Sequence, residues 1–140
     1  MIAIASDHAG FALKEKLKKH LEEIGVEYRD YGTYSTESCD YPVYAKKACS
    51  AVIEGECEKA RLVCGTGIGV SMAANNIKGI RAAVCSDTYS AKFTRLHNNA
   101  NTLCMGARVL GDGLAVEITD IFLTTPFEGG KHQRRIDMFE

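Results

Sequence analysis

A cysteine followed by three alternating glycines is the stretch of the sequence best suited to chemistry. This stretch, Cys64-Gly-Thr-Gly-Ile-Gly69, lies between a short apolar run and a run of small residues with helical character. A glycine-rich turn between a strand and a helix offers free backbone N–H groups and a positive helix end to an anion. The same surroundings favour the thiolate form of a nearby cysteine. We therefore expect Cys64 to act as a general base, with Thr66 and the turn amides stabilising an enediolate.

The same turn also fits simpler roles, which the sequence leaves open. Val70 stands where the dinucleotide-binding fingerprint has its third glycine, and the Gly-Lys-Ser/Thr of a P-loop does not follow. Tight strand-to-helix connections also use glycine for steric reasons alone. Cys64 by itself could be an ordinary buried strand cysteine, and Thr66 could be a helix N-cap.

A histidine among amides and a basic stretch near the carboxyl terminus could complete a site. His97 begins the run His-Asn-Asn-Ala-Asn and could move protons at a sugar ring oxygen, because imidazole titrates near neutrality. A lone histidine is more often a surface or helix-end residue, so the sequence leaves both interpretations of His97 open. The stretch Lys131-His-Gln-Arg-Arg135, with Arg108, could clamp a phosphate or be a solvated terminus, and Gly129-Gly130 favours a defined turn before it. Because no histidine pair has metal-ligand spacing, we predict no metal site.

Apolar and amphipathic stretches alternate five times, which predicts an open, mostly parallel five-stranded sheet with helices on both faces. Expected strands cover residues 2–5, 26–31, 60–63, 80–85 and 102–105. Expected helices cover 11–24, 41–55, 70–74, 88–96, a stretch after Asp112 that includes Leu114 to Phe122, and a short segment to 139. Expected caps are Asp40, Ser86 or Asp87, and Asp112. Ligands bind beyond the carboxyl ends of such strands, where Asp7-His8, Cys64-Thr66, Asp87 and Arg108 fall, although such residues are also common as plain caps. His97 and Asn98 end the fourth helix, so topology alone does not place them.

A length of 140 residues predicts one domain, over residues 1–140, and the alternating strands and helices make it α/β. The 46% hydrophobic and 25% charged content is that of an ordinary globular protein, and a net charge of −1 without a basic block gives no support for nucleic-acid binding. We expect no membrane span, because no apolar run approaches ~20 residues. Six cysteines without a C-x-x-C pair or a secretory signal predict reduced thiols in a cytoplasmic protein.

Several stretches, in order from end to end, resemble the type B ribose-5-phosphate isomerases. They are Ser6-Asp-His-Ala-Gly10, Asp40-Tyr-Pro42, Cys64 to Gly69 with Ser71, Gly79-Ile-Arg-Ala-Ala83, His97-Asn98 with Ala100-Asn101, Gly106-Ala-Arg-Val109, and Gly129-Gly-Lys-His132 with Arg135. The resemblance implies a Rossmann-like domain that forms a homodimer, sometimes a tetramer. It also implies aldose–ketose isomerisation of D-ribose 5-phosphate and D-ribulose 5-phosphate, in the non-oxidative branch of the pentose phosphate pathway, without metal or cofactor.

The resemblance also implies residue roles. Cys64 would move the proton between C2 and C1, Thr66 and the turn amides would hold the enediolate, and His97, with Asp7 nearby, would assist ring opening. The carboxyl-terminal segment 129–140 would contribute to the site or the dimer interface, and part of the phosphate set would cross that interface. The implied substrate-binding residues are His8, Tyr41, Gly65, Gly67, Gly69, Ser71, Asn98, Arg108, Lys131, His132 and Arg135.

Two departures from the family pattern concern the sugar and its phosphate. Lys131 replaces a usual arginine, which would cost the phosphate a bidentate partner. Asn99 replaces a frequent aspartate and gives a His-Asn-Asn run that is also found in one subunit type of galactose-6-phosphate isomerases. The alternatives are an isomerase for a six-carbon sugar phosphate (allose or galactose 6-phosphate), or a non-catalytic nucleotide-binding module in which Asp87 accepts the ribose.

Overall fold

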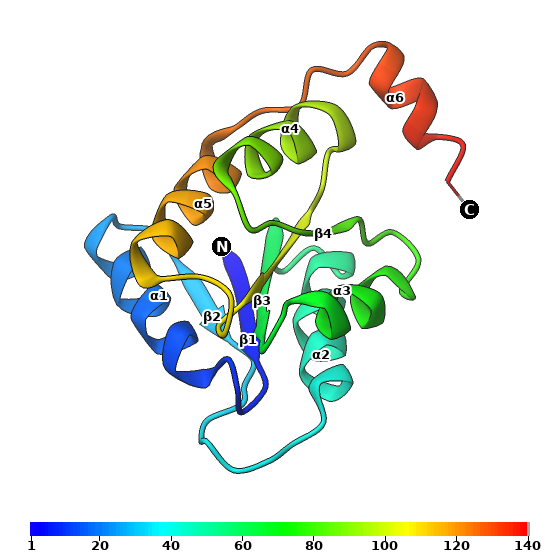
Figure 1. Cartoon of the computed structure of the whole chain (residues 1–140). Coiled ribbons are helices and arrows are strands. Elements are labelled where there is room, and N and C mark those ends of the chain that lie inside the picture. The colour runs from blue at the N-terminus through cyan, green and yellow to red at the C-terminus, as the bar shows by residue number, and fades with distance from the viewer. Residues whose placement is uncertain (140) are drawn as a thin grey trace.

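The computed structural model describes residues 1–139 and shows one parallel sheet between two layers of helices (Figure 1). The strands are β1 (Ile2–Ser6), β2 (Tyr28–Asp30), β3 (Lys59–Cys64), β4 (Ala82–Val84) and β5 (Thr102–Gly106). Their order across the sheet is β2-β1-β3-β5-β4, and all four pairings are parallel. The predicted fold class is confirmed.

Helices cover both faces of the sheet because successive strand side chains point to opposite sides. The helices are α1 (Phe11–Glu23), α2 (Tyr41–Ile53), α3 (Ile68–Asn75), α4 (Thr88–Asn98), α5 (Asp112–Thr124) and α6 (Lys131–Ile136). Leu62 and Cys64 of β3 pack in the core under α2 and α3, whereas Val63 packs with α1, α4 and α5 on the other side. In Figure 1, α6 lies at the outer end of α4, beyond these two layers.

Two strands are shorter than their apolar runs predict, because neighbouring groups take their backbone hydrogen bonds. The Val26 N–H donates to the Leu21 carbonyl (2.9 Å) and so closes the end of α1 instead of extending β2. The Arg81 N–H donates to the Asn101 side chain (2.8 Å), which leaves Ile80 and Arg81 outside β4.

Helix starts follow the predicted caps only in part. Asp87 caps α4, since its Oδ1 accepts from the Ser90 N–H at 2.6 Å. Asp40 occupies the N-cap of α2 without a side-chain cap hydrogen bond. The prediction for Asp112 is wrong: Gly111 is the N-cap of α5, and Asp112 is the first helical residue, where its charge still favours the positive helix end. Helix α6 ends at Ile136, before the expected residue 139.

The parallel sheet has two ends with different contents. Cys64 pairs with Gly106 at the carboxyl end of the sheet, and Ala60 pairs with Thr102 at the amino end. These ends are about 13 Å apart, since four residue steps rise about 3.3 Å each. Helix α4 leads back to the start of β5, so its last residues lie at the amino end (Figure 1). Within residues 1–139, no helix combines the length and apolarity needed to cross a membrane.

Candidate active site

The β3–α3 turn holds the Cys64 thiol against a backbone amide. The Gly67 N–H donates to Cys64 Sγ at 3.1 Å, and the cysteine is only 5% exposed. Gly67 is the N-cap of α3 and has a left-handed φ of +81°, which brings its N–H back over the sulfur. A hydrogen-bond donor in this position stabilises negative charge on sulfur. The turn therefore has the geometry expected of a thiol that accepts a proton.

Because glycine has no Cβ, the backbone at this turn packs closely against neighbouring residues. A Cβ on Gly67 would lie 2.8 Å from the Met105 carbonyl carbon, and a Cβ on Gly106 would lie 2.6 Å from the Thr66 carbonyl carbon. A Cβ on Gly69 would lie 2.8 Å from the Tyr41 ring. The turn is thus fitted against the end of β5 on one side and against Tyr41 on the other.

Two hydroxyl groups in the turn differ in what they can offer a ligand. Thr66 is exposed, and its Oγ1 accepts from the Ile68 N–H at 3.2 Å, so its own proton can be donated to an oxyanion. The buried Ser71 donates its proton to the Ile68 carbonyl at 2.6 Å. Ser71 therefore serves the first turn of α3, while Thr66 can serve the site.

The loop after β5 brings a guanidinium group over the turn. The Ala107 N–H donates to the Cys64 carbonyl (2.8 Å) and the Arg108 N–H to the Gly65 carbonyl (3.0 Å). A Cβ on Gly65 would lie 3.3 Å from Arg108 Nη1. The exposed Arg108 side chain is thereby placed beside the cysteine, where an anionic ligand could reach it.

Asp7 and His8 follow β1 and join the same end of the sheet. The Asp7 N–H donates to the Val63 carbonyl (3.2 Å), and its buried carboxylate accepts from the Gly10 N–H (3.0 Å). The Cys39 N–H donates to His8 Nδ1 at 3.2 Å. Because Nδ1 is an acceptor in this contact, the proton of the neutral imidazole is assigned to Nε2, where it can be donated to a ligand.

A buried ion pair fixes the loop that leads from β2 to Tyr41. Lys14 is 1% exposed and donates to both carboxylate oxygens of Asp30, at 2.7 and 2.9 Å, and also to the Thr33 carbonyl. Burial by itself raises the pKa of Asp30, but hydrogen bonds from Lys14, Gly32 and Lys18 outweigh it and hold the pKa below its ordinary value. The loop is therefore tied to α1, although no motif in the sequence points to this pair.

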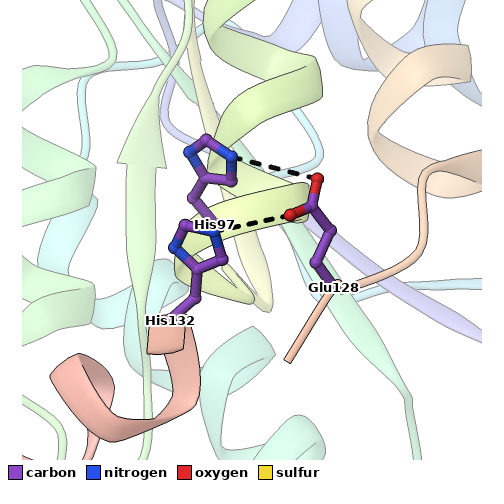
Figure 2. A group of neighbouring side chains, drawn as sticks. All are labelled: His97, Glu128 and His132. Carbon is purple, nitrogen blue, oxygen red and sulfur yellow. Dashed lines mark ion pairs between the residues drawn. The ribbon is translucent and has the colours of Figure 1, made fainter. Parts of the chain in front are cut away.

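His97 and His132 meet at the amino end of the sheet, together with Glu128 (Figure 2). The two imidazole rings stack with centroids 4.0 Å apart, and Glu128 lies beside both. Burial lowers the pKa of His132, the neighbouring His97 adds to this shift, and Glu128 opposes it. Asn98 is exposed at the same end of α4, and Lys131 and Arg135 are exposed on α6.

One chain thus divides the predicted site residues into two groups. Asp7, His8, Tyr41, Cys64 to Gly69 and Arg108 gather at the carboxyl end of the sheet. His97, Asn98 and the residues of α6 lie at the amino end, at the far end of β5. Sequence reasoning missed Glu128, for which the only signal was an acidic residue four positions before His132.

All six cysteines are free, as predicted. Burial raises the pKa values of Cys49 and Cys85 to about 11 and that of Cys104 well above its ordinary range, so these three are protonated at neutral pH. Cys64 differs from them in accepting a backbone N–H at the site turn.

Comparison with known proteins decides the family. The family model described as Ribose/Galactose Isomerase matches residues 2–139. The chain belongs to the Ribose/Galactose Isomerase family. This family member is 50% identical to ribose-5-phosphate isomerase B of Escherichia coli, over 97% of the chain and 91% of the relative.

Solved structures agree over the same length. The ribose 5-phosphate isomerase of Thermotoga maritima superposes with a TM-score of 0.96 at 54% identity, covering 97% of this chain and 94% of that one. The Mycoplasma genitalium ribose-5-phosphate isomerase B, solved with bound ribulose-5-phosphate, superposes at 0.93 with 41% identity, covering 97% and 91%. The resemblance of the sequence motifs to type B ribose-5-phosphate isomerases is therefore confirmed.

Proposed function

We propose that the protein interconverts D-ribose 5-phosphate and D-ribulose 5-phosphate. The observation that carries this proposal is the near full-length match to the Mycoplasma genitalium enzyme whose structure holds ribulose-5-phosphate. The described residues add a chemical reason, because a thiol, a set of turn amides and a free hydroxyl meet at one end of the sheet. Six free cysteines support placing this reaction in the reducing cytoplasm.

The geometry supports Cys64 as the base of an enediolate mechanism. The thiolate removes the proton from C2 of the open-chain aldose, and the electrons move onto the carbonyl oxygen at C1. The Thr66 hydroxyl and the turn amides donate to this oxyanion. The C2 hydroxyl proton passes to the C1 oxygen, the thiol returns its proton to C1, and a ketone at C2 results.

Basic groups around the turn fit the phosphate end of such a sugar. Arg108 lies beside Gly65, and His8 has its Nε2 proton free to donate. Arginine suits bidentate contacts with phosphate oxygens. Lys131, His132 and Arg135 carry further basic groups on α6, but they lie at the other end of the sheet.

We also propose that a second copy of the chain completes each site. Cys64 and His97 lie about 13 Å or more apart along the strands of one chain, too far to act on one pentose carbon and ring oxygen. Among residues 1–139, no further strand pairs with the β4 edge of the sheet. Val84, Tyr89 and Phe93 line a cavity of about 350 Å³ there, and His97 also lines it. Tyr89 is 70% exposed, which is typical of a surface that another subunit covers.

Mixing two inactive variants tests the shared site directly. Cys64→Ala and His97→Ala each remove one half of the site, so each homodimer alone should be nearly inactive. In a mixed dimer one of the two sites keeps both residues, so random association should restore about a quarter of wild-type activity. A co-expressed mixture no more active than the separate variants would contradict the shared site.

The substrate is tested with ribose 5-phosphate and allose 6-phosphate in parallel, on metal-free protein. We expect the pentose to turn over and to raise the melting temperature. Turnover of the hexose phosphate alone would retain the reaction and overturn the substrate. Stabilisation by NAD with indifference to both sugars would instead favour a nucleotide-binding module.

A further inference from the structure

We propose that His97, Glu128 and His132 form a binding site for a divalent transition-metal ion such as Zn²⁺, and that an ion bound there inhibits the enzyme. The three residues come from α4, from the segment after α5 and from α6. Only Glu128 and His132 are close in sequence, so local spacing does not reveal the set of three. The expectation of no metal site rested on local spacing alone.

One distance in this cluster matches the spacing of metal ligands, and the others are somewhat longer. Glu128 Oε2 lies 3.4 Å from His132 Nε2, and Glu128 Oε1 lies 4.0 Å from His97 Nε2. All three ligand atoms lie within 4.8 Å of one another. Neighbouring ligands around a tetrahedral zinc ion with bonds of about 2.0–2.1 Å are about 3.3 Å apart. A hydrogen bond from an imidazolium to a carboxylate is shorter, about 2.7–2.9 Å.

Backbone contacts hold the three side chains in this arrangement. The Glu128 N–H donates to the Leu96 carbonyl at 3.1 Å, next to His97 in the last turn of α4. Gly129 and Gly130 have φ values of +73° and +57°, and this turn brings His132 back to face Glu128. Figure 2 shows both Nε2 atoms directed toward the carboxylate. Small movements of the exposed Glu128 side chain would close the longer distance.

The chemistry of the donor set also fits. Two imidazoles and one carboxylate are a known zinc set that leaves a fourth position for water. Metal binding needs neutral imidazole, so it competes with protons and is favoured as the pH rises. The side chains of His97 and Glu128 are 38% and 51% exposed, so an ion can enter from solution. Imidazole nitrogen suits zinc, nickel and copper rather than magnesium or calcium.

Inhibition follows from the second role of His97, and this part of the inference rests on the proposed function. A metal ion takes the Nε2 lone pair that would otherwise accept or deliver a proton at the sugar ring oxygen. The ion would also draw His132 away from a phosphate. Bound metal and bound sugar phosphate should therefore exclude each other.

The test uses the 140-residue protein, treated with chelator and then dialysed free of it. Calorimetric titration with Zn²⁺ should show one ion per subunit that Glu128→Gln weakens by about tenfold or more, because one of three ligands loses its charge. Asp120→Asn is the matched control. Asp120 Oδ1 lies 2.7 Å from His20 Nε2, a carboxylate–histidine pair without a second imidazole, so its loss should leave the affinity unchanged.

A Co²⁺ titration distinguishes metal binding at this site from metal binding by the cysteines. Ligation by His97, Glu128 and His132 should give a Co²⁺ absorption spectrum without a thiolate charge-transfer band. A thiolate band, or equal Zn²⁺ affinity in wild type and Glu128→Gln, would overturn the site. Neither measurement depends on what the enzyme isomerises.

Activity then tests the inhibitory part. Zn²⁺ should lower ribose 5-phosphate isomerisation by the wild type and Asp120→Asn alike, chelator should restore it, and Glu128→Gln should need about tenfold more Zn²⁺ relative to its own metal-free rate. Binding that depends on Glu128 but leaves the rate unchanged would overturn inhibition through His97. Absence of isomerisation in metal-free wild type would overturn the proposed function. The Zn²⁺ and Co²⁺ titrations would still decide whether the metal site exists.

Discussion

At the carboxyl end of the sheet, backbone N–H groups donate directly to site side chains, whereas at the amino end two imidazole side chains contact each other. Cys64 and Asp7 each accept a backbone N–H from their own turn, three residues later, and His8 accepts one from the loop before α2. His97 and His132 stack at 4.0 Å beside an exposed carboxylate. The first group is fixed by the fold itself, while the second can change its protonation and its partners. A base that must reach one carbon atom needs a fixed position, whereas groups that bind and release a sugar can change their contacts.

The largest effect should follow loss of the Cys64 thiol. Cys64→Ala removes the proposed base, so kcat for ribose 5-phosphate should fall about 10³-fold with little change in melting temperature. Cys85→Ala is the control, because burial raises the pKa of that thiol to about 11 and it lies in the core. Similar rate losses in Cys64→Ala and Cys85→Ala would contradict the proposed role of Cys64 as the catalytic base.

Gly67→Ala should displace the backbone N–H that donates to Cys64 Sγ while leaving the thiol in place. The left-handed φ of +81° and a Cβ 2.8 Å from Met105 force the turn to shift, and a shift near 1 Å can cost about 10²-fold in rate. Unfolding by urea should show a loss of about 1–3 kcal/mol. Gly113→Ala, where an added Cβ meets nothing within 4 Å, should keep both rate and stability. A fully active Gly67→Ala variant would contradict a role of the Gly67 N–H in supporting Cys64.

A smaller effect is expected from the exposed α6. Lys131→Arg supplies a guanidinium that can bind phosphate oxygens bidentately, so KM for ribose 5-phosphate should fall a few-fold with kcat nearly constant. Arg134→Lys, on the same helix but outside the predicted substrate set, should change neither. An unchanged KM in Lys131→Arg would place Lys131 outside the phosphate site.

The most subtle difference concerns the protonation of His132. Its pKa lies below the ordinary 6.5 because of burial and His97, and Glu128→Gln should lower it further by removing the opposing charge. An NMR titration of the ring protons measures both shifts. Because the unfolded chain binds this proton more readily, the contribution of His132 to stability is lost as pH falls through 6.5 toward its folded pKa. A His132 that titrates above 6.5 in the folded protein would contradict the lowered pKa.

Structural features that depend on residues close together in the chain could be predicted from sequence patterns. The apolar run before Cys64 and the glycines after it are neighbours in the chain, so the strand, the turn and the helix could all be predicted. The start of β2 could not, because the Val26 N–H closes the end of α1 on the Leu21 carbonyl, a helix-end hydrogen bond that apolar periodicity does not record. Asp112 was expected as a cap because aspartate is common there, but Gly111 occupies that position.

The composition of the two site groups could be predicted less well than the fold. Residues that follow parallel strands must share the carboxyl end, so Asp7, Cys64 and Arg108 could be grouped from topology. His97 ends a helix, and its neighbours depend on where the chain returns after α5. The contact with Glu128, 31 residues later, is for that reason invisible in the sequence.

The placement of Cys64 and His97 at opposite ends of one sheet has a consequence for dilution. If each site needs both residues from different subunits, a lone subunit has no complete site, and catalysis depends on association by mass action. Specific activity should then fall as the protein is diluted below its dimer dissociation constant, although every molecule stays folded. The amount of enzyme in a cell would set the output twice, through the number of subunits and through the fraction of them that are paired.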